Sequence, residues 1–230
     1  MHHRFGKTVV VALGGSIVYP DTIDAAFIKK FKTFVGKFTR RGTRFVLVLG
    51  GGRIARTYQE AAHAVGPIGN EDKDWLGIHA TRLNAHLIRT VFKDVAHPVV
   101  IDQRHKLKKL DHPVTVGGGW HPGWSTDYVA TVLAHDFGAK EVVIAGKPDH
   151  VYDRDPHLYK NAKPLPELSW KEYRTLIPAK WVPGSHAPVD PVAARFGETH
   201  RVKGIIIDGR DLANFEALLK GKEFRGTIIS

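Results

Sequence analysis

The sequence predicts an α/β protein, a three-layer α/β/α sandwich with a mainly parallel central sheet. Short apolar runs typical of buried strands alternate along the chain with longer segments of helical periodicity. Three of the apolar runs are followed at once by glycine-rich turns, which are Gly14-Gly15-Ser16, Gly50-Gly51-Gly52 and Gly117-Gly118-Gly119. With 230 residues, of which 43% are hydrophobic, the chain can bury one large core, so we expect a single domain.

The first half of the chain alternates strands with helices. Helical periodicity is clearest over 24–41, where Phe27, Phe31 and Phe34 share one face. A polar loop over 66–73 should precede a helix over 74–92, whose buried face is expected to consist of Leu76, Ala80, Leu83, Leu87 and Val91. The other elements expected here are strands over 8–13, 44–49, 99–101 and 114–116 and helices over 53–65 and 125–137.

The second half begins with a strand over 141–145 and then changes in texture. The segment 146–166 contains four prolines and little periodicity, which predicts an ordered loop or a small hairpin. The remaining pattern predicts helices over 169–176, 189–196 and 212–219, and strands over 204–207 and 226–229. This alternation favours parallel strands with helices on both faces.

The glycine turns point to a chemistry. At the carboxyl end of a parallel strand, such a turn lets backbone N–H groups converge on an anion, because no side chain blocks the approach. Three such turns in one chain predict a site shared by several phosphates, and therefore phosphoryl transfer. The alternative is that they are tight strand-to-helix turns that hold no ligand.

Composition narrows the possible partners. The 34 Lys and Arg residues outnumber 23 Asp and Glu, a formal net charge of +11 that attracts anions. The densest basic run, 104–109, lacks a nucleic-acid motif and is interpreted as a solvated helix face, so nucleotides rather than nucleic acid are expected. No apolar run suits a membrane span and no signal peptide is evident. The absence of cysteine is compatible with the cytoplasm, and the 14 dispersed histidines show no helical ligand spacing, so no metal site is expected.

Further motifs accompany the glycine turns in a fixed order. They are Arg-Ile-Ala-Arg-Thr-Tyr at 53–58, Asp-Trp-Leu-Gly-Ile-His-Ala-Thr-Arg-Leu-Asn-Ala at 74–85, His-Pro-Gly-Trp-Ser-Thr-Asp at 121–127, Val-Tyr-Asp-Arg-Asp-Pro at 151–156, Gly-Ser-His-Ala-Pro-Val-Asp at 184–190 and Gly-Thr at 226–227. Together the motifs cover nearly the whole chain. In this order they resemble the amino acid kinase family, and within it the archaeal type of uridylate (UMP) kinase.

The resemblance implies a reaction and an assembly. Such kinases use ATP with Mg²⁺ and transfer the γ-phosphoryl in line to the 5′-phosphate of UMP, so the protein has to align two anions and neutralise their charge. The resemblance also implies a homohexamer. An amino-terminal lobe, about 1–137, would bind the acceptor, and a carboxyl-terminal lobe, about 138–230, would bind ATP.

The resemblance also assigns roles to residues. On the ATP side it places Gly15, Ser16, Gly52, Arg56, Gly146, Lys147, Tyr152 and Asp155. Around the acceptor it places Gly51, Asp74, Trp120, His121, Pro122, Gly123, Trp124, Ser125 and Thr126. Arg56 and Asp127 would be catalytic, Arg56 on the phosphoryl groups and Asp127 as an acidic organiser. Arg56 could instead be a surface residue, and Asp74 could cap the helix that follows it.

Three departures from the family pattern affect these roles. Ala12 stands where many members have a lysine, and Lys147 could replace that charge. Residues 146–150 read Gly-Lys-Pro-Asp-His where UMP kinases usually have Thr-Asn-Val-Asp-Gly, and Trp120 and Trp124 replace small or polar residues. Another phosphate or carboxylate acceptor, storage of an oxyanion such as molybdate, and nucleotide sensing therefore stay open. An isopentenyl phosphate kinase fits less well, because 52–56 contains no histidine.

Overall fold

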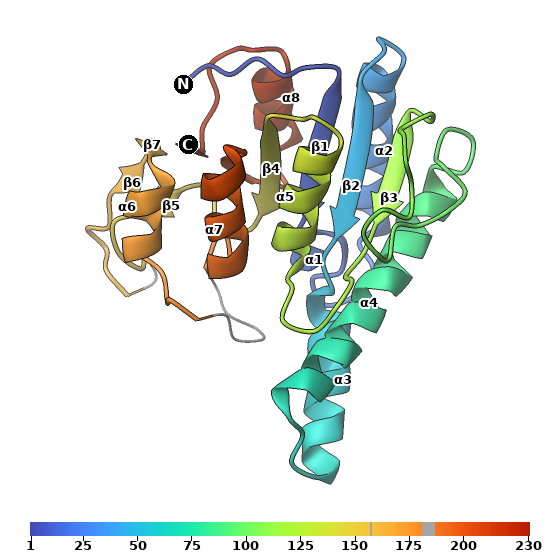
Figure 1. The fold of residues 1–230 in the computed structure, drawn as a ribbon, viewed down its shortest axis with the longest axis vertical. Helices are drawn as coiled ribbons and strands as arrows, with labels where there is room; N and C mark the ends of the chain where they lie inside the picture. The colour runs from blue at the N-terminus through green and yellow to red at the C-terminus, as the bar shows by residue number, and fades with distance from the viewer. Residues whose placement is uncertain (157, 181–186) are drawn as a thin grey trace.

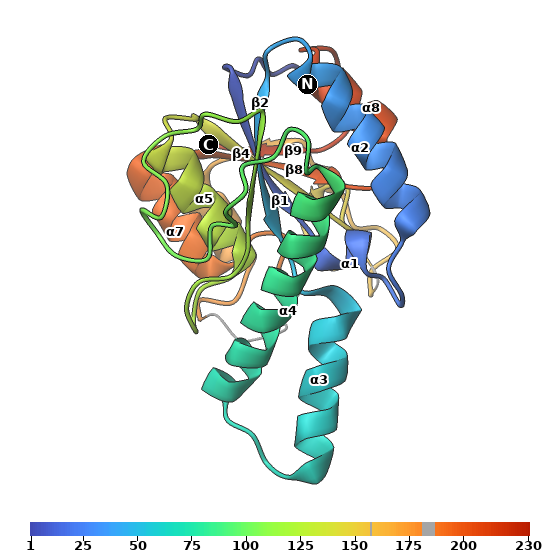
Figure 2. The ribbon, with the colours of Figure 1, turned by 90° about the vertical axis from the view of Figure 1, so that its right-hand side faces the viewer.

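A seven-stranded sheet lies between two helical layers in the computed structural model, which describes residues 1–156, 158–180 and 187–230 (Figures 1 and 2). The strand order is β3-β2-β1-β4-β8-β9-β7. The strands are β1 (Thr8–Leu13), β2 (Arg44–Leu49), β3 (Val114–Gly117), β4 (Glu141–Gly146), β7 (Glu167–Leu168), β8 (Lys203–Asp208) and β9 (Thr227–Ile229). The first five in spatial order are parallel, whereas β9 runs antiparallel to β8. The predicted fold class is confirmed.

Strand alternation divides the core into two layers. Val9 and Val11 of β1 pack on one face of the sheet, under α2 (Ala25–Thr39), α8 (Leu212–Leu219) and the second half of α4 (Asn70–Val91). Val10 and Ala12 point to the other face, which is covered by α5 (Thr126–Asp136), α6 (Trp170–Thr175) and α7 (Pro191–His200). Successive residues of a strand point to opposite faces, so a continuous apolar run fits a strand buried on both.

The carboxyl ends of the parallel strands gather at one edge of the sheet. Helices α1 (Gly15–Val18) and α3 (Gly52–Val65) begin at this edge, directly after β1 and β2. Helices α3 and α4 pack against each other and form an arm that projects beyond the edge (Figure 2). Ligands of open parallel sheets bind at this edge, so the fold brings the candidate residues to the expected place.

Several expected local features are wrong. Segment 99–101 is not a strand, because only Ile101 forms a bridge, to Gly117. Helix α4 begins at Asn70, inside the expected loop, and Leu83 is 59% exposed on it. Its buried residues are Ile78, Ala80, Thr81, Asn84, Ala85 and Ile88, so Ala80 is buried as expected, whereas Leu87 and Val91 are only partly buried. The basic run 104–109 is a loop rather than a helix face.

A small hairpin follows β4, as the proline-rich segment allowed. Strands β5 (Val151–Tyr152) and β6 (Pro164–Leu165) pair antiparallel beside the main sheet. The short α1 and the two-residue β7 were not expected from the sequence. No helix in the described part of the chain has the length and apolar character needed to cross a membrane.

Candidate active site

The first two glycine turns pack backbone against backbone. A Cβ on Gly15 would lie 2.0 Å from the amide nitrogen of Gly52, and one on Gly50 would lie 2.4 Å from that of Gly15. Gly52 also has a φ of +66°, in the left-handed region that favours glycine. Glycine is therefore required here for close approach of the two turns.

Two helices start from these turns with uncapped amino termini. Neither α1 nor α3 has a side chain that accepts a hydrogen bond from its first turn. The first N–H groups of a helix have no acceptor within the helix, and the helix dipole adds positive potential there. Gly15, Ser16, Gly51 and Gly52 thus place backbone donors at the carboxyl edge, where they suit an anion.

The third glycine turn is different, because the protein uses its donors. The Gly118 N–H donates to the Ile101 carbonyl at 3.0 Å, and the Gly119 N–H donates to Thr81 Oγ1 at 2.7 Å. The interpretation of this turn as a set of free anion donors is therefore wrong for these two residues. Its glycines instead allow α4 to pack closely, since a Cβ on Gly119 would lie 3.1 Å from Thr81 Oγ1.

Helix α4 holds two of the turns through side chains to which the sequence motifs assigned no role. Arg82 donates from Nε to the Gly119 carbonyl at 3.0 Å, and from Nη2 to the Trp120 carbonyl at 3.2 Å. Asn84 donates from Nδ2 to the carbonyls of Gly50 at 2.8 Å and Gly51 at 3.1 Å. A polar side chain on the buried face of a helix needs a hydrogen-bond partner, and this was the signal in the sequence that could have identified them.

Asp74 and the loop after β3 form the predicted acceptor region. Asp74 Oδ2 accepts a hydrogen bond from the Gly123 N–H at 2.8 Å, and Gly123 has a φ of +84°. Burial raises the pKa of Asp74, and the hydrogen bond from Gly123 partly opposes this rise. Because α4 begins at Asn70, Asp74 lies inside the helix, and its interpretation as an amino-terminal cap is wrong.

Aromatic rings surround this loop. The His121 ring lies 6.4 Å from Trp75 and 5.5 Å from Trp124, between ring centroids. Trp124 is 38% exposed and can offer a face to a base, whereas Trp120 is 5% exposed and packs in the core beneath α5. The Trp120 indole N–H is buried and has no hydrogen-bond partner within the described chain. Pro122 completes the turn, and its carbonyl lies 2.8 Å from His121 Nδ1.

The amino-terminal ends of α5 and α7 lie close together and carry the carboxyl groups of Asp127 and Asp190. Ser125 caps α5 by accepting from the Tyr128 N–H at 3.0 Å, and its hydroxyl donates a hydrogen bond to Asp190. Asp190 in turn caps α7 by accepting from the N–H groups of Val192 and Ala193. Thr126 and Asp127 lie in the first turn of α5, directly after Ser125.

Asp127 has the most perturbed carboxyl group of the site. Desolvation by burial, and then the negative charge of Asp190, raise the pKa of Asp127 to about 8. Burial also raises the pKa of Asp190, although hydrogen bonds from Ser125 and the α7 backbone oppose this rise. Asp127 is therefore largely protonated near neutral pH.

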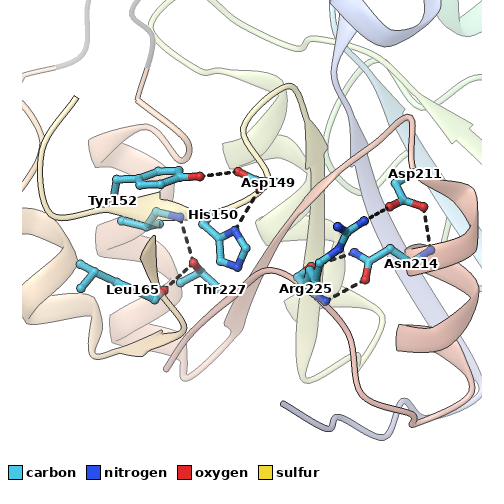
Figure 3. A network of polar contacts seen from close by, with 9 residues as sticks. Asp149, His150, Tyr152, Leu165, Asp211, Asn214, Arg225 and Thr227 are labelled. Atoms are coloured by element: carbon cyan, nitrogen blue, oxygen red, sulfur yellow. Dashed lines mark hydrogen bonds and ion pairs between the residues drawn. The ribbon is translucent and has the colours of Figure 1, made fainter. Parts of the chain in front are cut away.

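Figure 3 shows the hairpin, which carries the predicted ATP-side residue Tyr152, together with the start of α8. The Tyr152 hydroxyl donates to Asp149 at 2.9 Å, and Thr227 anchors the hairpin by accepting from the Val151 N–H at 2.8 Å and donating to the Leu165 carbonyl at 2.6 Å. Figure 3 also shows Asp211, the cap of α8, accepting hydrogen bonds from the Asn214 N–H and from Arg225 Nη2. The Arg225 N–H in turn donates to the Asn214 side chain.

The other predicted ATP-side residues have these positions. Gly146 ends β4, exposed Lys147 follows it, and the Asp155 carbonyl accepts from the Tyr159 N–H at 2.9 Å. Arg56 is exposed in the second turn of α3 and has no ion pair in the described chain, whereas Arg53 pairs with Glu60 at 3.1 Å. Of the motif at 184–190, residues 184–186 lie outside the described chain.

Comparison with known proteins identifies the family. A model of the amino acid kinase family matches residues 7–208. This chain belongs to the amino acid kinase family. Its kinase relatives include a uridylate kinase of Methanocorpusculum labreanum, 37% identical over 96% of this chain and 94% of the relative, and one of Thermococcus sibiricus, 34% identical over 96% and 98%.

A solved kinase structure agrees with these relatives. The crystal structure of uridylate kinase from Archaeoglobus fulgidus matches with a TM-score of 0.83 and 29% identity, covering 98% of this chain and 100% of that one. Within the amino acid kinase family, the chain therefore groups with the archaeal uridylate kinases. The resemblance inferred from its motifs is confirmed.

Proposed function

We propose that this member of the amino acid kinase family is a UMP kinase, which transfers the γ-phosphoryl group of ATP to UMP. The observation that carries the proposal is the match to uridylate kinases along nearly the full length of both chains. The geometry is consistent with it, because two uncapped helix starts and the Asp74 loop lie at the same edge of the sheet.

The reaction requires the protein to align two anions, ATP and UMP. An oxygen of the UMP phosphate attacks the γ-phosphorus, and the bond to the β–γ bridging oxygen breaks, so that UDP and ADP form. The N–H groups at the starts of α1 and α3 would bind the phosphoryl oxygens, with Gly15, Ser16 and Gly52 on the ATP side. Arg56 would donate two hydrogen bonds to the same groups.

Asp127 and Asp190 fit an acidic organiser. Two neighbouring carboxyl groups offer the oxygen ligands that Mg²⁺ prefers, and bound Mg²⁺ would neutralise phosphate charge. Without such a cation, the raised pKa keeps Asp127 protonated and able to donate to a phosphate oxygen without repulsion. Lys147, at the end of β4, would supply part of the positive charge that Ala12 lacks.

The two nucleotides would occupy opposite sides of this edge. The second carboxylate oxygen of Asp74 would accept hydrogen bonds from the UMP ribose, and the loop from Trp120 to Thr126 would enclose uracil and phosphate. Tyr152 and Asp155 would line the adenosine site. The lobe 1–137 would thus hold the acceptor and contribute its glycine turns to the ATP phosphates, and the lobe 138–230 would hold the rest of ATP, in a cytoplasmic homohexamer.

An acceptor panel tests the proposal. ADP release from Mg·ATP should be stimulated by UMP above CMP, dUMP, AMP and GMP, measured with a coupled assay. If none of these nucleotides raises ADP formation above the ATP-only rate, UMP kinase activity is wrong. Detection of bound molybdate would then favour storage, and nucleotide binding without turnover would favour a regulator.

Two neighbouring arginines of α3 provide a matched pair of variants. Arg56→Ala should lower kcat/KM by about 10- to 100-fold, because one charge-assisted phosphate contact contributes about 1.5–3 kcal/mol. Arg53→Ala removes the same charge from the same helix, but from a residue paired with Glu60, and should change kcat/KM less than threefold. Equal effects of the two variants would show that Arg56 acts only through surface charge.

A further inference from the structure

Three potential metal ligands converge at the edge of the sheet opposite the glycine turns. His97, Asp111 and His112 each offer one ligand atom, and all three atoms lie within 4.8 Å of one another. Asp111 Oδ1 is 2.7 Å from His112 Nδ1 and 3.9 Å from His97 Nε2. We propose that these residues bind a transition-metal dication such as Zn²⁺.

The backbone holds the two histidines side by side. A parallel bridge joins Ala96 to Val114, with hydrogen bonds from the His97 N–H to the Val114 carbonyl at 2.8 Å and from the Val114 N–H to the Val95 carbonyl at 3.2 Å. Each histidine also precedes a proline, which restricts its backbone to extended conformations. The site is therefore positioned without the metal, and binding would order little of the chain.

The imidazole of His97 is held by two contacts with the Val99 backbone. The Val99 N–H donates to His97 Nδ1 at 3.1 Å, and the Val99 carbonyl lies 3.3 Å from the same nitrogen. With Nδ1 as the acceptor, the ring proton is on Nε2, so a metal bound through Nε2 would require this proton to move to Nδ1, where it can donate to the Val99 carbonyl. Metal-bound histidines commonly donate their second N–H to a carbonyl in this way. The His97 side chain is 14% exposed and its ring meets that of His112 at 4.8 Å and 78°, so the two rings approach from different directions.

The ligand set selects the class of metal. Ligand atoms of a tetrahedral zinc site lie about 3.3 Å apart, so shifts below about 1 Å would bring these three atoms into place. The His112 proton now shared with Asp111 would have to move to Nε2. Two imidazoles and one carboxylate suit Zn²⁺, Co²⁺ or Ni²⁺, whereas Mg²⁺ and Ca²⁺ prefer oxygen ligands alone. A fourth position stays open to water.

The place of the site in the fold indicates a structural role. His97 follows α4 and Asp111 precedes β3, so a metal would close the loop 98–110 at its base. The base of that loop lies at the amino-terminal end of β3, away from the glycine turns after β1 and β2, whereas Ile101 within the loop pairs with Gly117 at the other end of β3. A ligand that binds only the folded chain stabilises it, and a clip that closes a loop does so without taking part in catalysis.

Zinc binding by the full chain tests this site directly. Isothermal titration with ZnCl₂ should show a site of micromolar affinity that His97→Ala, His112→Ala and Asp111→Asn each weaken at least tenfold. His63→Ala, which removes an exposed histidine of α3, should leave this affinity unchanged. Zinc at 100 times its Kd should raise the Tm of the wild type by about 5 °C, and that of His112→Ala by less than 1 °C.

A cobalt spectrum adds a readout of geometry. Co²⁺ bound to the wild type should give visible absorption of four- or five-coordinate intensity, and this absorption should disappear in His112→Ala. The proposal is wrong if the wild type binds no Zn²⁺ below 1 mM, or if the three cluster variants bind it as tightly as the wild type. Because no step of the test uses turnover, its outcome is independent of the proposed kinase activity.

Discussion

Carboxyl groups of the candidate site differ in ionisation because their surroundings differ. Asp127 lies beside Asp190 and forms no ion pair in the described chain, and its pKa rises to about 8. Asp74 accepts from a backbone N–H, which offsets part of the effect of its burial. Asp74 is thus suited to accept hydrogen bonds from a ribose, and Asp127 to hold a proton or a cation.

The proton on Asp127 predicts a pH-dependent stability. In the unfolded chain this carboxyl titrates near 3.8, and in the folded chain near 8, so the folded state holds an extra proton between these values. The free energy of unfolding should therefore fall as pH rises from about 4 to 8. Asp127→Asn should remove this part of the decline, and at pH 8.5 it should be more stable than the wild type by about 2 kcal/mol after solvent screening.

Urea unfolding at pH 5 and pH 8.5 measures this difference. The exposed Asp94→Asn serves as the control and should follow the wild type at both values. If Asp127→Asn and wild type lose stability in parallel between the two pH values, Asp127 does not carry the proton.

Replacing Asp74 should affect the KM for UMP but hardly the KM for ATP. Asp74→Asn keeps an oxygen for the Gly123 N–H but loses the second carboxylate oxygen, so the loop should stay in place while the ribose contact weakens. The KM for UMP should rise about tenfold, equivalent to about 1.4 kcal/mol, with less than a twofold change in the KM for ATP. Steady-state kinetics with each nucleotide varied in turn would decide. Equal increases for both would leave Asp74 a role in positioning the loop alone.

At the scale of elements, α4 organises the site. Its polar residues Thr81, Arg82 and Asn84 hold the second and third glycine turns by hydrogen bonds to backbone groups. This explains why the helix buries polar side chains and exposes Leu83. The same turns supply the starts of α3 and the acceptor loop, so the stability of α4 and the geometry of the site depend on the same contacts.

Thr81 offers a test of this coupling. Thr81→Val keeps the shape of the side chain but leaves the buried Gly119 N–H without its acceptor, which should cost about 1–3 kcal/mol of unfolding free energy. With the loop less well held, kcat/KM for UMP should also fall about tenfold. Thr81→Ser retains the hydroxyl and should recover most of both losses. Urea unfolding and turnover measure the two effects. Loss of stability with unchanged kcat/KM would show that the contact only supports the fold.

At the scale of the whole molecule, the sequence predicts the sheet better than its surroundings. Strands β1 and β2 lie where expected, because strands buried on both faces form continuous apolar runs that end at glycine. The buried face of α4 could not be predicted from apolar spacing, since hydrogen bonds to distant turns bury Thr81 and Asn84. Asp74 was likewise identified through a family motif. Its hydrogen bond with the Gly123 N–H could not be predicted, because it joins residues 49 positions apart.

The arm formed by α3 and α4 exposes apolar side chains that do not pack in the core. Among the α3 residues only Ala55 is buried, and Tyr58, Val65 and Leu83 are 60%, 92% and 59% exposed. Apolar side chains on a projecting element favour contact with another copy of the chain, and closed symmetric assemblies are the usual result. The homohexamer proposed above predicts about six times the chain mass of 25.6 kDa by light scattering at micromolar concentration. Leu83→Asp should lower this mass by placing a charge in the contact, whereas Leu158→Asp, at a 75% exposed site off the arm, should not. A monomeric wild type would refute the assembly, and an unchanged mass for Leu83→Asp would exclude the α4 side of the arm as its interface.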